Sequence, residues 1–192
     1  MKNRIMLTYL ISLMHLLILC SCNQKPEPET YLIPSDFIGK VNILFNQNGT
    51  PVKYKNVNGQ EVIHTPQIGE PVKYENGRRV YEIPASGILL TQFKDEYGFV
   101  DRKYYSVDAT GKRTELEVFK FEHFKKDSAG YVVKNNIQKG VFGDGTSVSY
   151  GNMNLKAQDF YVSAYNQLDS FFTKEYLKNF NEKVERITRL KL

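Results

Sequence analysis

The N-terminal segment constrains this chain most, because it decides which residues remain to build a folded domain. Lys2 and Arg4 precede an apolar run from Ile5 to Leu19. A basic start followed by an apolar run of this length is typical of a secretory signal, and the run is short for a stable membrane span. We therefore expect residues 1–21 to be a signal peptide. A signal anchor that stays uncleaved is the alternative.

Cys22 follows the apolar run in a context that resembles a bacterial lipobox. Leu19 is aliphatic three places before it and Ser21 is small one place before it, although Cys20 departs from the usual pattern. The resemblance implies cleavage between Ser21 and Cys22, a diacylglycerol on the Cys22 sulfur, and a further acyl chain such as palmitate on its new amino group. Acyl chains of this number anchor a protein stably to a membrane. An ordinary signal peptide with two incidental cysteines is the alternative.

Cleavage at Cys22 would leave a mature chain without a free thiol. Its domain therefore needs a hydrophobic core rather than disulfides, and it has no cysteine nucleophile. The signal carries two of the 26 basic residues and none of the 21 acidic ones, so the formal net charge falls from +5 to +3. A mildly basic exported chain without a recognition motif does not indicate nucleic acid as a partner. Residues 22–30, with Pro26 and Pro28, are interpreted as a polar tether.

Residues 31–153 have the pattern of a β-rich domain. Short apolar or alternating runs occur at residues 41–45, 79–83 and 87–93, and turn signals separate them. Residues 108–111 (DATG) indicate a hairpin turn. Many short strands at such spacing predict an α+β, mainly β fold, built as an antiparallel sandwich or a small barrel.

One motif occurs twice, at residues 51–69 and 71–87. Both copies begin with Pro-Val-Lys-Tyr and continue with Asn-Gly, an apolar pair, Pro and Gly. Because Asn-Gly favours a type I′ turn, each copy is expected to form a hairpin. Two copies are too few for a solenoid. We interpret them as a local duplication that lengthened a loop or added an outer hairpin, with a duplicated recognition loop as the alternative.

Residues 154–192 change to a helical period. Apolar residues recur at i, i+3 and i+4 between Ala157 and Phe172, and again between Leu177 and Ile187. We expect one or two C-terminal helices that pack on the sheet as part of the same domain. Thr173 is a candidate N-cap for the second helix. Docking of a partner on the last helix is the alternative.

The mature chain shows no catalytic or metal-binding motif, and it implies no cofactor. Its two histidines, His64 and His123, lie outside any G-x-S-x-G, H-E-x-x-H or EF-hand pattern. Residues 140–151 are rich in glycine but lack a P-loop lysine, so we expect an Asp-Gly hairpin there rather than an anion-binding loop. The alternative function is an envelope hydrolase that pairs His123 or His64 with a carboxylate such as Glu122 or Asp101.

Asp127-Ser128-Ala129 matches the short sequon that Bacteroidota use for periplasmic O-glycosylation. The tripeptide lies in a loop rich in Lys, Asp and Gly, which should be accessible. Ser128 is therefore a candidate site of O-glycosylation, with an unmodified loop as the alternative.

Five short motifs resemble, in combination, an uncharacterised family of Bacteroidota lipoproteins with a domain of unknown function. They are YLIP at residues 31–34, ENGRRVYEIP at 75–84, GILLTQ at 87–92, YYSVDATGKR at 104–113 and VFGDGT at 141–146. The resemblance implies a β-rich lipoprotein domain and no assigned activity, so it carries no catalytic residues.

These observations favour a non-catalytic envelope module that is anchored to a membrane through Cys22. We expect the outer membrane, with the periplasmic and the surface face both open. A protein or a glycan is the expected partner.

Overall fold

The structure is a computed structural model that describes residues 26–55, 58–96, 98–119, 124–127, 130–133, 137–150 and 155–189. Several predicted site residues lie outside these ranges and stay predictions: Ser21, Cys22, Glu122, His123 and Ser128.

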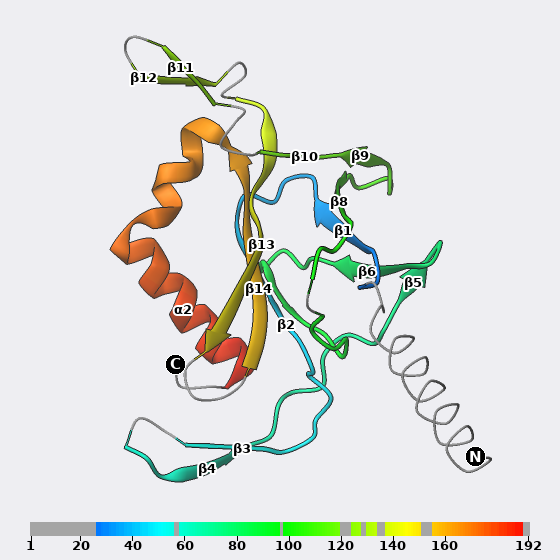
Figure 1. The fold of residues 1–192 in the computed structure, drawn as a ribbon, viewed down its shortest axis with the longest axis vertical. Coiled ribbons are helices and arrows are strands. Elements are labelled where there is room, and N and C mark those ends of the chain that lie inside the picture. Colours follow the sequence, from blue (N-terminus) through cyan, green and yellow to red (C-terminus); the bar gives the residue numbers. More distant parts are fainter. Residues whose placement is uncertain are drawn as a thin grey trace, which may run out of the picture.

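A first five-stranded sheet, here called the β1 sheet, has the order β5-β6-β1-β8-β9 (Figure 1). Its strands are β5 (Tyr74–Glu75), β6 (Arg78–Glu82), β1 (Glu29–Pro34), β8 (Arg102–Val107) and β9 (Arg113–Glu115). β1 lies at the centre and runs parallel to both β6 and β8. The outer strands β5 and β9 pair antiparallel with their hairpin partners β6 and β8.

A second five-stranded sheet, here called the β14 sheet, has the order β10-β13-β14-β2-β7. Its strands are β10 (Glu117–Val118), β13 (Lys139–Tyr150), β14 (Leu155–Ala164), β2 (Gly39–Leu44) and β7 (Ile88–Leu90). The three central strands are antiparallel, and the edge strands β10 and β7 pair parallel with their neighbours.

Two further hairpins project from the body at opposite ends of the molecule in Figure 1. One consists of β3 (Val52–Lys55) and β4 (Glu61–His64), and the other of β11 (Phe124–Asp127) and β12 (Gly130–Val133). Each forms a two-stranded sheet of its own.

The main hydrophobic core lies between the two five-stranded sheets. Tyr31 and Tyr104 of the β1 sheet pack there with Ile43, Phe160 and Val162 of the β14 sheet. The described strands thus form a sandwich and no closed barrel, which confirms the predicted β-rich sandwich. Both sheets are mixed rather than purely antiparallel. β1 runs parallel to β6 and β8, β7 runs parallel to β2, and β10 runs parallel to β13.

The outer face of the β14 sheet is covered by a helical layer (Figure 1). A 3₁₀ helix, η3 (Tyr165–Phe172), leads into α2 (Lys174–Thr188). Phe180 and Val184 of α2 pack on Leu44 and Ala157 in a second core cluster. The predicted cap is confirmed, since the Thr173 hydroxyl accepts a hydrogen bond from the Tyr176 backbone nitrogen at 3.2 Å.

The expected helix over residues 157–164 is wrong, because this stretch belongs to β14. Phe160 and Val162 face the inner core, while Ala157 lies in the cluster under α2. A strand buried on both faces carries apolar residues on both, and such a pattern can coincide with helical spacing. Pairing with β13 on one side and β2 on the other makes this segment a strand rather than a helix.

The expected Asp-Gly hairpin within residues 140–151 is also wrong. β13 runs through this segment and stays paired with β14, with a register shift between Phe142 and Thr146. Gly143 has a φ of 72° in the shifted part. The glycine-rich segment is therefore a β-bulge, which allows a long strand to bend.

Both copies of the repeat form hairpins, as predicted. The second copy provides β5 and β6, and Asn76 and Gly77 both have positive φ (51° and 73°), as a type I′ turn requires. The first copy provides β3 and β4, joined by the longer connection between Lys55 and Glu61. Only the second copy belongs to a five-stranded sheet.

Part of the expected tether is folded onto the domain. The Glu27 carboxylate accepts hydrogen bonds from Arg79 Nε at 2.6 Å and from the Tyr74 hydroxyl at 2.9 Å. The Arg79 backbone nitrogen donates to the Pro28 carbonyl at 2.9 Å, and β1 begins at Glu29. Residues 26–30 thus belong to the body, whereas the rest of the expected tether, residues 22–25, lies outside the described residues.

The packing of α2 can be tested by replacing Phe180. Phe180→Ala should lower the free energy of unfolding by about 3 kcal/mol, because it removes a buried ring and leaves a cavity. Lys178→Ala on the exposed face of the same helix should change it by less than about 0.5 kcal/mol. Urea unfolding followed by circular dichroism measures both. Equal effects of the two substitutions would show that α2 does not pack on the sheet.

The docking of Glu27 predicts a dependence of stability on pH. Hydrogen bonds from Arg79 and Tyr74 lower the pKa of Glu27 in the folded state. Their contribution is complete above the unfolded pKa of about 4.3 and is lost as the pH falls through the lower folded pKa. The free energy of unfolding of wild type should therefore exceed that of Glu27→Gln near neutral pH, and the difference should disappear in this acid range. Midpoints of urea unfolding at several pH values measure this difference. A difference that stays constant with pH would contradict the hydrogen bonding of an ionised Glu27 to Arg79 and Tyr74.

Candidate binding groove

A groove of about 600 Å³ lies where the two sheets meet at one edge of the sandwich. One wall is the segment at residues 68–73, which leads into the second repeat copy. The other surfaces come from β6 with Pro84 and from β7 with Thr91. The groove is therefore built by parts of both sheets and by the Pro-Val-Lys of the repeat.

Backbone hydrogen bonds fix the first wall to the edge of β7. The Glu70 nitrogen donates to the Leu90 carbonyl at 2.7 Å, and the Gln92 nitrogen donates to the Glu70 carbonyl at 3.0 Å. The Gly69 nitrogen donates to the Gln47 carbonyl at 2.7 Å. A Cβ at Gly69 would lie 2.5 Å from the Leu90 carbonyl carbon, so this close approach requires glycine.

The floor of the groove is apolar and its rim exposes apolar side chains to solvent. Val80, Ile88 and Leu89 of the floor are buried. At the rim, Ile68 is 76% exposed and Val72 is 47% exposed. Exposed aliphatic side chains beside a concave surface are typical of a binding site rather than of an ordinary protein surface.

The groove has three charged residues in its lining, and two of them are engaged with each other. Lys73 forms an ion pair with Glu82, and Glu70 is the remaining charged residue of the lining. The described residues contain no group of three or more His, Cys, Asp or Glu side chains that could hold a metal ion. The groove therefore suits an apolar, extended ligand better than an ion or a highly charged one.

Behind the groove lies a stack of three tyrosines from neighbouring strands. Tyr31 of β1 is in register with Tyr81 of β6 and with Tyr104 of β8. Its ring stacks on theirs at centroid distances of 5.0 Å and 4.7 Å. The stack spans the centre of the β1 sheet and belongs to the main core.

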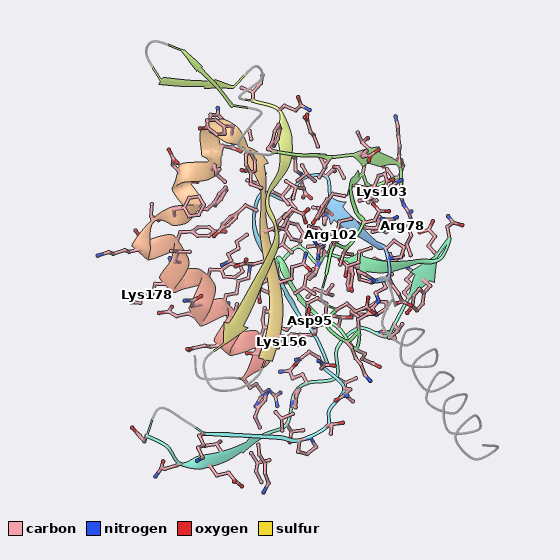
Figure 2. The ribbon with its side chains drawn as sticks, in the orientation of Figure 1. Arg78, Asp95, Arg102, Lys103, Lys156 and Lys178 are labelled. Atoms are coloured by element: carbon pink, nitrogen blue, oxygen red, sulfur yellow. The ribbon has the colours of Figure 1, made fainter. Side chains whose placement is uncertain are left out.

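A buried carboxylate accepts hydrogen bonds from two of the three hydroxyl groups of this stack, and the third, that of Tyr104, donates to Asp144. Glu29, which is 3% exposed, accepts hydrogen bonds from Tyr31 at 2.5 Å and from Tyr81 at 3.2 Å. Arg102 Nε donates to the same carboxylate at 2.9 Å, and Figure 2 shows this arginine at the centre of the molecule. The Tyr31 hydroxyl also lies 3.3 Å from Gln158 Oε1 of the β14 sheet, so the network joins both sheets.

The protonation state of the stack argues for a structural role. Burial raises the pKa of Tyr31, Tyr81 and Tyr104 well above the usual value of a phenol. All three hydroxyls therefore stay protonated at neutral pH and act as hydrogen-bond donors. Burial thus acts against the lowered pKa that activates a tyrosine as a nucleophile or a general base.

The structure does not bring His64 and Asp101 together. His64 ends β4 in the projecting hairpin, where burial lowers its pKa and favours the neutral ring. Asp101 precedes β8 in the β1 sheet and is bound to Arg78 at 2.5 Å, which lowers the pKa of that carboxylate. Neither residue lines the groove. The described residues thus give no support to a hydrolase site built from this pair.

Sequence reasoning missed both the groove and the tyrosine stack, although signals for both exist. Gly69 ends the first repeat copy and Pro71 begins the second, at the wall of the groove. The three tyrosines lie in three of the quoted motifs, YLIP, VYEIP and YYSV. Only the parallel register of β6, β1 and β8 brings the three tyrosines together, and no hairpin signal in the sequence predicts that register.

Comparison with protein families gives a match over residues 58–169, which covers the whole groove. The matching model is described as "Family of unknown function (DUF6843)". The chain belongs to this family. Its uncharacterised status agrees with the resemblance stated from the motifs, which implied no assigned activity.

Among solved structures, the chain is similar to a crystal structure named "Putative Lipoprotein from Bacillus anthracis", with 15% sequence identity and a TM-score of 0.46. That similarity covers 87% of this chain and 100% of the other. No curated protein matches the chain. In the described part of the chain, no helix is both long and apolar enough to cross a membrane.

The fixed wall of the groove can be tested at Gly69. Gly69→Ala should lower the free energy of unfolding by about 3 kcal/mol, because its Cβ would collide with the backbone of β7. Gly77→Ala should cost only about 1 kcal/mol, since its site is open and only the positive φ is strained. Chemical unfolding of the two variants measures the difference. A Gly69→Ala protein as stable as wild type would contradict the close approach.

Proposed function

We propose that the protein is an envelope lipoprotein, anchored through Cys22, whose groove binds an extended segment of a protein partner. The export signal and the Leu19-Cys20-Ser21-Cys22 context support the anchor. We propose the outer membrane as its location, because the motif resemblance is to lipoproteins of Bacteroidota. No step of this proposal requires catalysis.

The apolar rim of the groove is the observation that carries the binding role. Ile68 and Val72 are exposed beside a buried aliphatic floor, and hydrogen bonds hold their segment in place. A rigid wall lowers the entropy that is lost on binding. An extended peptide places alternate side chains on one face, so its apolar residues could reach Val80 and Ile88.

A protein segment fits this groove better than a glycan does. Sugars are commonly bound on the open face of an aromatic ring. The one aromatic residue in the lining, Tyr81, is 1% exposed and stacks on Tyr31. It therefore offers no free face to a sugar.

The anchor is tested by removing the acceptor cysteine. Wild type should be found in the membrane fraction, with a mature N-terminus at Cys22 that carries lipid. Cys22→Ala should lose the lipid, whereas Cys20→Ala should keep it. Metabolic labelling with palmitate and intact mass measure these states, and the same mass reports whether Ser128 carries a glycan. Lipid attached to Cys22→Ala would contradict the proposal.

The groove is tested by photo-crosslinking in intact cells. A photoreactive amino acid at position 72 should give one discrete adduct, and Ile68→Asp should reduce its yield about tenfold by placing a charge at the apolar rim. Ile63→Asp is the matched control, because Ile63 is 62% exposed on the separate β3–β4 hairpin. Mass spectrometry identifies the adduct. Phe172, which is 54% exposed at the end of η3, is the control position for the photoreactive residue. An adduct that is insensitive to Ile68→Asp, or that forms equally from position 172, would contradict binding in the groove.

A further inference from the structure

The proposed anchor places a strict limit on where the membrane can lie. Pro26 is the first described residue and follows Cys22 by four residues. Four residues span at most about 14 Å even when fully extended. If Cys22 is lipidated as proposed above, the surface around Pro26 must lie within that distance of the bilayer.

The chain next to Pro26 is bound to the loop between β7 and β8 and cannot swing freely. The Glu27 nitrogen donates to a Glu96 carboxylate oxygen at 2.7 Å. Arg79 binds both Glu27 and Glu96 and also donates to the Lys94 carbonyl at 2.7 Å. This loop is therefore the part of the body that the anchor holds nearest to the membrane.

The same loop presents a fully exposed aromatic ring. Phe99 is 104% exposed, and it follows Gly98, where a Cβ would lie 3.4 Å from the Pro26 ring. Tyr74, whose hydroxyl binds Glu27, is 51% exposed nearby. A phenylalanine without any covering contact gains by burial in the interface of a bilayer, where aromatic rings are enriched.

The charges around Phe99 also suit a lipid surface. The carboxylates of Glu27 and Glu96 both pair with Arg79, which offsets part of their charge, and Asp101 is paired with Arg78. Lys94 and Lys103 are exposed on either side of Phe99 in the sequence. Figure 2 shows Lys103 and Arg78 on the side of the molecule opposite α2 and Lys178. Exposed lysines next to an aromatic ring favour contact with anionic headgroups.

We propose that Phe99, with Lys94 and Lys103, forms a membrane contact surface that inserts into the headgroup region of the bilayer that holds the anchor. The anchor alone would leave the domain free to rotate about its tether. This second contact sets the orientation of the domain, and hence of the groove, relative to the membrane.

The experiment uses the full-length lipidated protein in vesicles of phosphatidylethanolamine and phosphatidylglycerol. Phe99→Cys introduces the sole free thiol of the mature chain, because Cys22 is acylated, and it takes an environment-sensitive fluorophore. Ile137→Cys is the matched control, since Ile137 is 74% exposed near the start of β13. Brominated lipids should quench the probe at position 99 by roughly half, as expected for a residue at the boundary of headgroups and acyl chains, and leave position 137 unaffected.

The outcomes separate this proposal from the anchor itself. Quenching at position 99 alone, with a blue-shifted emission, supports the contact surface. Equal quenching at both positions, or none at position 99 in a protein that remains vesicle-bound, overturns the contact surface and leaves the anchor standing. A full-length protein that carries no lipid and does not bind vesicles overturns both.

Discussion

The stacking of Tyr31 between Tyr81 and Tyr104 is the interaction on which the rest of the structure depends. β1 has two parallel neighbours and no hairpin to set its register, and a slip of one residue would turn its core residues to the wrong face. Three rings in register, with hydroxyls directed at Glu29 and Asp144, allow one alignment of the three strands. A buried polar network of this kind costs stability when it is incomplete, so it favours one arrangement over its alternatives.

The groove follows from this arrangement. β6 is held by Tyr81 in the tyrosine stack. Val80, which precedes Tyr81 and points to the opposite face of the strand, contributes to the groove floor. β7 belongs to the other sheet, and the Gly69 contact holds the rim segment against it. Because the walls come from two sheets that the core fixes relative to each other, the groove exists before any ligand arrives. Preformed sites of this kind bind with a smaller loss of entropy.

Local signals in the sequence predicted the local structure well. The Asn76-Gly77 turn, the Thr173 cap and the β-rich sandwich with a C-terminal helix are all present. Signals of this kind act over a few residues, where turn geometry and capping are decided by the residue types themselves.

Features that depend on distant contacts were missed or misread. Residues 157–164 show helical spacing only because β14 is buried on both faces. The glycines of residues 140–151 indicate a turn in isolation, but pairing with β14 makes them a bulge. The sequence predicts Glu29 to be part of a polar tether, although Arg102, 73 residues away, binds it inside the core. The groove was missed because its walls come from three separate segments, so the repeat boundary at Gly69 and Pro71 does not by itself indicate a concave surface.

Under the proposed function, the tyrosine stack maintains the fold while the groove rim binds the partner. The most direct measurement is the yield of partner adduct from a photoreactive residue at position 68, set against the free energy of unfolding, for Tyr31→Phe and Val72→Asp. Tyr31→Phe should lose about 1–3 kcal/mol of stability, because Glu29 stays buried with one donor fewer, and should keep the adduct yield of wild type. Val72→Asp should keep its stability and lose the adduct. A Tyr31→Phe protein that is folded but gives no adduct, or a Val72→Asp protein that gives the wild-type yield, would contradict the account.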